Sequence, residues 1–167
     1  MPRFDDVTTT ATPYTTRRRA RVLALQALYE IDGSAHDPES VVTQRVREMS
    51  QTQAVETFAR KIVRGVLENL ERIDRIIGTH APAWPIRQLA AVDRNLLRVA
   101  VYELAIDGDT PPKVAINEAV EIGKTFGSDA SFRFVNGVLG SVLAEREASG
   151  EAERNGKTME VVDVNGS

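Results

Sequence analysis

Apolar residues recur at spacings of three and four along most of this chain, which predicts helices and no sheet. The first periodic stretch follows Thr16 and predicts a helix that ends near Asp32, where Gly33 suits a helix stop. Its apolar face carries Ala20, Leu23, Ala24, Ala27, Leu28 and Ile31. We expect one stripe of this helix to be buried against the rest of the chain.

The next two stretches complete the first half of the chain. Pro38 lies in the first turn of a predicted short, polar helix. Ser50 and Gln53 form a capping box in front of the longest periodic stretch. Apolar residues from Val55 onward keep to one face of this stretch, so we expect one long amphipathic helix that ends at Gly78.

Prolines in residues 81–85 interrupt the helices, because proline disfavours helix at the residue before it. We expect a short helix over about 86–90, a helix capped by Asp93, one over about 112–126 and one that starts at Ser128 or Asp129. The sequence therefore predicts an all-α protein of about seven helices. We divide it into a disordered arm (1–14), a helical domain (15–147, with subdomains of about 15–80 and 81–147) and an acidic disordered tail (148–167).

Composition argues against an enzyme. The chain has no cysteine, which excludes disulfides, thiolate catalysis and cysteine zinc sites. His36 and His80 have no metal ligand at a suitable spacing, and we expect both to be exposed. Gly137 and Gly140 lack the strand and loop of a phosphate-binding turn, so we interpret them as sites of close helix packing. We predict no catalytic, cofactor or metal site.

The sequence also favours a cytoplasmic protein with no membrane association. The first 16 residues lack the apolar run of a signal peptide, and no segment approaches the roughly 18 apolar residues of a membrane span. Carboxylates such as Glu118 and Glu121 are expected on solvated helix faces.

Positive charge is concentrated at the start of the first helix, although the net charge is -3. The chain has no acidic residue between Thr8 and Tyr29, and a helix start favours negative charge. Four arginines occupy it: Arg17, Arg18, Arg19 and Arg21. Guanidinium groups suit phosphates and stack on unpaired bases, so this end could bind RNA or another polyanion. A solvated helix end and a contact with a membrane surface or an acidic protein remain alternatives.

Several motifs resemble those of the NusB transcription antitermination family. In the second half these are VDRNLLRVAVYEL (92–104), PKVAINEAVEI (112–122), KTFG (124–127) and FVNGVL (134–139). In the first half they are RRRAR (17–21) and QALY (26–29). Together they cover the chain from about residue 16 to 145. The resemblance implies two perpendicular helical bundles in a non-enzymatic factor. It also implies binding, with ribosomal protein S10, to the single-stranded boxA element of ribosomal RNA leaders, in support of processive transcription by the elongation complex.

The resemblance also assigns site residues. It implies RNA contacts by Arg17, Arg18, Arg19, Arg21, Gln26, Tyr29 and Phe134. It places Asp93, and also Tyr29, on the side that meets S10. Ala130 stands where some members have a carboxylate beside the RNA path, so RNA affinity need not be lower in this chain. Two other interpretations remain: a detached N-terminal RNA-binding domain of an RNA methyltransferase type, and a helical protein that acts as a homodimer.

Overall fold

The computed structural model describes residues 13–49 and 51–163, which contain seven α-helices and no strand. The helices are α1 (Pro13–Asp32), α2 (Pro38–Met49), α3 (Gln53–Glu68), α4 (Leu70–His80), α5 (Ala91–Val101), α6 (Pro112–Phe126) and α7 (Ser131–Asp163). A short 3₁₀ turn, η2 (Ile86–Gln88), precedes α5, and a π-helical segment, η3 (Tyr102–Asp107), follows it directly. The predicted all-α class is confirmed. Most of the arm, Ser50 and the last four residues lie outside the described range.

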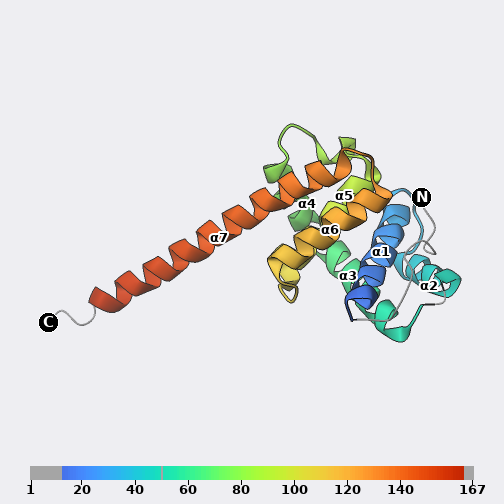
Figure 1. Ribbon diagram of the computed structural model, residues 1–167, viewed down its shortest axis with the longest axis horizontal. Coiled ribbons are helices and arrows are strands. Elements are labelled where there is room, and N and C mark those ends of the chain that lie inside the picture. The colour runs from blue at the N-terminus through green and yellow to red at the C-terminus, as the bar shows by residue number, and fades with distance from the viewer. Residues whose placement is uncertain (1–12, 50, 164–167) are drawn as a thin grey trace.

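Two buried helices, α1 and α5, lie at the centre of the fold. α1 packs against α2, α3 and α5, and α5 packs against α4, α6 and α7 as well as α1 (Figure 1). The nine consecutive residues 20–28 are all buried, so the predicted single buried stripe of α1 is wrong. Neighbouring helices cover α1 on several sides. The apolar residues Val22 and Leu25, which lie off the predicted stripe, are the sequence signal for this wider burial.

The predicted long helix of the first half is divided in two at Asn69. The φ of Asn69 is -117°, outside the helical range, and its side-chain Nδ2 donates to the carbonyl of Gly65 at 2.8 Å. Thr52 caps α3 by accepting a hydrogen bond from the Val55 amide. The apolar face continues across the break, since Val66 and Ile73 are both buried. Because the spacing of apolar residues is continuous across Asn69, the sequence pattern did not reveal the helix break there.

Two other predicted helix starts also differ from the structure. α5 begins at Ala91, and Asp93 lies in its first turn instead of capping it. α7 begins at Ser131, whose Oγ accepts from the Ser128 amide at 2.8 Å. α4 packs mainly against α5 and α7, which follow the expected subdomain boundary. That division and the perpendicular arrangement of bundles stay predictions.

α7 extends to Asp163, well past residue 148, where its end was expected. Figure 1 shows this helix running far beyond the other helices. Its extension from residue 144 to 153 is rich in alanine and glutamate, which favour helix even without tertiary contacts. The side chains of 144–149 and 151–153 are exposed, so packing contributes little there. None of the described helices is long and apolar enough for a membrane span.

Candidate nucleic-acid interface

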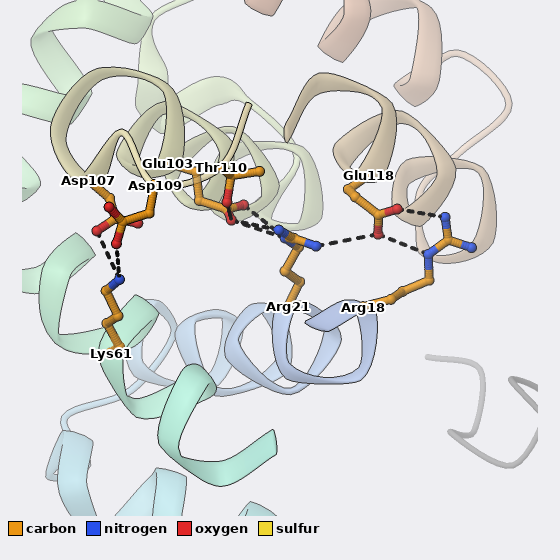
Figure 2. Close-up of polar contacts among 8 residues, drawn as sticks. All are labelled: Arg18, Arg21, Lys61, Glu103, Asp107, Asp109, Thr110 and Glu118. Carbon is orange, nitrogen blue, oxygen red and sulfur yellow. Dashed lines mark hydrogen bonds and ion pairs between the residues drawn. The ribbon is translucent and has the colours of Figure 1, made fainter. Parts of the chain in front are cut away.

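The four arginines at the start of α1 have different environments. Arg21 is only 3% exposed, and its guanidinium binds the carboxylate of Glu103 on η3 (Figure 2). Its Nε donates to both carboxylate oxygens at 3.0 and 3.1 Å, and its Nη2 donates to one of them at 2.8 Å. The Thr110 hydroxyl donates to the same carboxylate at 3.0 Å. Arg21 is therefore part of the buried interior and is not available to a ligand.

Arg18 binds Glu118 of α6 in a two-pronged ion pair. Its Nε and Nη2 each donate to a different carboxylate oxygen at 3.0 Å, while Nη1 of Arg21 lies 3.6 Å from the same carboxylate. The Glu118 side chain is 2% exposed and that of Arg18 is 25% exposed. The expectation that Glu118 lies on a solvated face is wrong. Glu118 is buried because two arginines of α1 neutralise its carboxylate. The pattern of apolar residues within α6 carries no information about such partners.

Arg17 and Arg19 differ from the other two. Arg17 is exposed, and its guanidinium carbon lies 5.4 Å from the ring centroid of Phe58 on α3, a cation–π distance. Arg19 is half-buried, and its Nε has no hydrogen-bond partner among the residues that the structure describes. Arg17 and Arg19 are thus the arginines of this cluster that can meet a phosphate without first breaking a carboxylate pair.

Lys61 connects α3 to the segment between η3 and α6. Its ammonium lies 2.9 Å from Asp109 and 3.0 Å from Asp107, as Figure 2 shows. The hydrogen bonds that the Lys61 ammonium donates to Asp109 and Asp107 raise the pKa of Lys61 to about 12. The same bond from Lys61 lowers the pKa of the Asp109 carboxyl. Lys61 therefore stays charged but brings little net positive charge to this surface.

Gln26 and Tyr29 lie at different depths on α1. Gln26 is 5% exposed, and its carbonyl oxygen has no partner within the described part of the chain. Tyr29 is 45% exposed. Tyr29 can contact a partner directly, whereas Gln26 lies within the α1 core.

Phe134 is half-buried on α7 and packs against the core. Phe132, which lies one helical turn before the buried Val135, is also half-buried but does not belong to that core. Its ring lies 5.7 Å from the Lys124 ammonium and 5.5 Å from the Arg133 guanidinium carbon. The start of α7 therefore carries an aromatic ring close to two cations. Helical spacing alone would place this ring in the interior.

The expectation of close helix packing at Gly137 and Gly140 is wrong. Both glycines are exposed, and a Cβ atom at either position would meet open space. They lie on the side of α7 opposite Val138 and Leu139, which are buried. Among the described residues, no other helix comes within 4 Å of a Cβ atom built at either glycine.

Asp93 is half-buried in the first turn of α5, and its Oδ1 has no hydrogen-bond partner among the described residues. The neighbouring Arg94 donates to Asp32 at the end of α1 and to the carbonyls of Ile86 and Leu89. Asp32 lies one helical turn from Tyr29. The end of α1, the start of α5 and the η2 turn thus form one ordered surface region.

The expectation that His80 is exposed is wrong: its side chain is only 9% exposed. Its Nδ1 lies 2.7 Å from the Ser141 hydroxyl, and its Nε2 lies 2.5 Å from the Glu145 carboxylate. These contacts attach the end of α4 to α7. The residues described in the structure contain no group of three or more His, Cys, Asp or Glu side chains that could hold a metal ion.

Sequence reasoning missed Glu103 and Phe58. A signal existed for Glu103, because it is a single carboxylate within the apolar run at residues 99–106. Buried carboxylates need a cationic partner, so Glu103 called for one, although the sequence did not show which cation it would be. Phe58 gave no such signal, since it fits the apolar period of α3.

Comparison with known proteins agrees with this architecture. The model of the NusB family matches residues 18–144. The transcription antitermination protein NusB of Roseiflexus sp. (strain RS-1) is 48% identical over 130 residues, which cover 77% of this chain and 92% of that protein. NusB of Chloroflexus aggregans is 47% identical over 141 residues, which cover 81% and 94%.

Solved structures show the same fold. NusB of T. maritima superposes with a TM-score of 0.73 at 36% identity, covering 81% of this chain and 94% of that one. A crystal structure of antitermination factors NusB and NusE in complex with dsRNA gives a TM-score of 0.71 at 30% identity, with coverage of 76% and 95%. This chain belongs to the NusB family of transcription antitermination proteins, which are non-enzymatic regulators.

Proposed function

We propose that this chain binds boxA-type single-stranded RNA of ribosomal RNA leaders together with ribosomal protein S10. The assembly would act within the transcription elongation complex to keep ribosomal RNA transcription processive. A similar solved structure that pairs NusB with NusE, which is S10, and RNA supports this class of partners.

The observation that carries the proposed RNA binding is that the four arginines of α1 differ in exposure and in ion pairing. Arg18 and Arg21 are held by buried carboxylates, while Arg17 is exposed and Arg19 is half-buried. Arg17 and Arg19 lie in the second turn of α1, next to the first-turn N–H groups that also favour anions. We assign phosphate contacts to Arg17 and Arg19, and we give Arg18 and Arg21 the role of fixing α1 against η3 and α6.

The other predicted RNA residues divide in a similar way. Tyr29 and Phe134 have accessible aromatic surface for unstacked bases. Gln26 is buried, so we assign it a supporting role within α1 in place of direct RNA contact. The Arg18 side chain is only 25% exposed, so we assign it at most a minor contact with RNA.

For S10, we propose the surface around Asp93 and Tyr29. The Oδ1 atom of Asp93 is buried and has no hydrogen-bond partner among the described residues, which costs free energy that a donor inserted by S10 would recover. Arg94 fixes this surface by joining Asp32 to the η2 turn. An S10 donor opposite Asp93 and an S10 side chain against Tyr29 would complete it.

A titration of fluorescently labelled RNA by anisotropy tests this function. We expect boxA-type single-stranded RNA to bind more tightly than a scrambled strand or a duplex of the same length, and more tightly still when S10 is present. Sedimentation shows whether a homodimer of the chain dissociates as S10 binds. Equal binding of all three RNAs, with no effect of S10, would contradict the proposal.

A further inference from the structure

Phe58 on α3 lies beside the start of α1 and contacts two of its arginines. The guanidinium carbon of Arg17 lies 5.4 Å from the ring centroid, and that of Arg21 lies 5.6 Å from it. The ring itself is half-buried and packs against the core. Arg21 is held by Glu103, so this layer of side chains is anchored at its inner end.

The surface next to this layer is open. A shallow groove on α3 runs beside Phe58 and is lined by Gln53, Ala54, Thr57, Phe58 and Lys61. Most of this lining is small or apolar, and the exposed Arg17 lies at the Phe58 side. A ligand group with a flat apolar face and a polar edge fits this groove.

We propose that Arg17, whose guanidinium lies over the ring of Phe58, is a stacking platform for one unpaired nucleobase, so that the RNA path continues from the start of α1 onto the α3 groove. This inference rests on the proposed function. Guanidinium planes stack on bases, while their edge N–H groups remain free to donate to a phosphate. Phe58 acts as a positioning residue, since it orients Arg17 and does not need to touch RNA itself.

Charge favours a base over a phosphate in the groove. The cation that lines it, Lys61, is already bound by Asp107 and Asp109, and the Asp109 side chain is largely exposed. The exposed carboxylate would repel a phosphate placed in the groove. A base carries no charge, so it avoids this repulsion.

Rigidity favours affinity. Phe58 is packed against the core, Arg21 is fixed by Glu103, and Lys61 holds the neighbouring loop. Of the side chains in this layer, the exposed Arg17 is the one that loses freedom when a base stacks on it. A platform that is largely formed before binding loses little entropy on complex formation.

The test uses the full-length chain and boxA-type RNA in which 2-aminopurine replaces one base at a time. Stacking quenches this fluorophore, so we expect one position to be quenched by the wild-type chain in a manner that depends on Arg17. Arg17→Lys keeps the charge and loses the plane. We expect it to bind roughly 3- to 10-fold more weakly, with an unchanged salt dependence and without the quenching at that position.

Two variants examine Phe58. Phe58→Leu should weaken binding and reduce the same quenching, and Phe58→Tyr should restore both because it keeps an aromatic face. Phe126→Leu, a core substitution on α6, is the control for general loss of stability. Wild-type quenching at no position, or full affinity and quenching in Arg17→Lys, would overturn the platform while leaving RNA binding intact. Failure of the wild-type chain to bind RNA at all would instead remove the proposed function, and the platform with it.

Discussion

The guanidinium of Arg21 and the carboxylate of Glu103 lie 82 positions apart in the chain yet form three hydrogen bonds in the interior. Each side chain is at most 3% exposed. The pair joins the start of α1 to the π-helical segment after α5, and therefore connects the two central helices. Its role is structural, although the arginine belongs to a motif that the sequence alone assigned to RNA.

Glu103→Gln should destabilise the fold by about 3–5 kcal/mol, because it removes the hydrogen-bonded counterion of the buried Arg21 and leaves only Glu118, at 3.6 Å, near that charge. The substitution keeps the size of the side chain and an acceptor for Thr110. Chemical denaturation monitored by circular dichroism measures the loss. Glu71→Gln is the matched control, since Glu71 pairs with Arg75 on the exposed face of α4 and should change stability little. Equal effects of both substitutions would refute the structural role.

Gly65 is required by the ring of Tyr102. A Cβ atom at residue 65 would overlap the ring carbons and hydroxyl of Tyr102. Gly65→Ala should therefore destabilise the fold by about 1–3 kcal/mol through overpacking. Gly78→Ala meets open space in α4 and should stabilise it by about 0.5–1 kcal/mol. Thermal unfolding of the two variants should thus give shifts of opposite sign, and shifts of the same sign would count against this packing.

Asp32 makes stability depend on pH. Burial alone would raise the pKa of Asp32, but hydrogen bonds from Arg94 and Asn95 and the charge of Arg98 hold it below the ordinary value of 3.8. A depressed carboxyl pKa adds stability that is fully present above the unfolded-state pKa. This stability is lost as the pH falls through the lower pKa of the folded state.

The difference in unfolding free energy between the wild type and Asp32→Asn should therefore be largest near neutral pH. It should shrink as the pH drops below about 3.8. Denaturation series at several pH values measure it. A difference that stays constant down to pH 2 would mean that the Asp32 carboxylate does not stabilise the fold through its charge.

The sequence predicted the helices well where apolar period and helix signals agree, as at Pro38 and over α6. The predicted stripe of α1 was too narrow, because Val22 and Leu25 make the helix apolar on further sides, and such a helix is buried. The sequence could not distinguish Arg21 from Arg17, since the partners Glu103 and Phe58 come from distant parts of the chain. The helix break at Asn69 was hidden because the apolar face continues through it.

The candidate site follows the same division. Tyr29 and Arg17 are accessible, as the motif suggested, whereas Gln26 and Arg21 are buried. A motif records which residues are present together but not which of them serve the fold. A variant that replaces all four arginines would remove Arg21 from its buried pair, so its loss of RNA binding would not distinguish contact from unfolding.

The salt dependence of RNA binding by an Arg17→Ala/Arg19→Ala variant in the presence of S10 tests the account most directly. Each lost phosphate contact should reduce the slope of log affinity against log salt by about 0.7 for a single strand, so the double variant should lose about 1.4. Arg72→Ala/Arg75→Ala on the exposed face of α4 removes the same charge and should keep the wild-type slope. Equal slopes for the wild type and the Arg17→Ala/Arg19→Ala variant would contradict RNA binding at the start of α1.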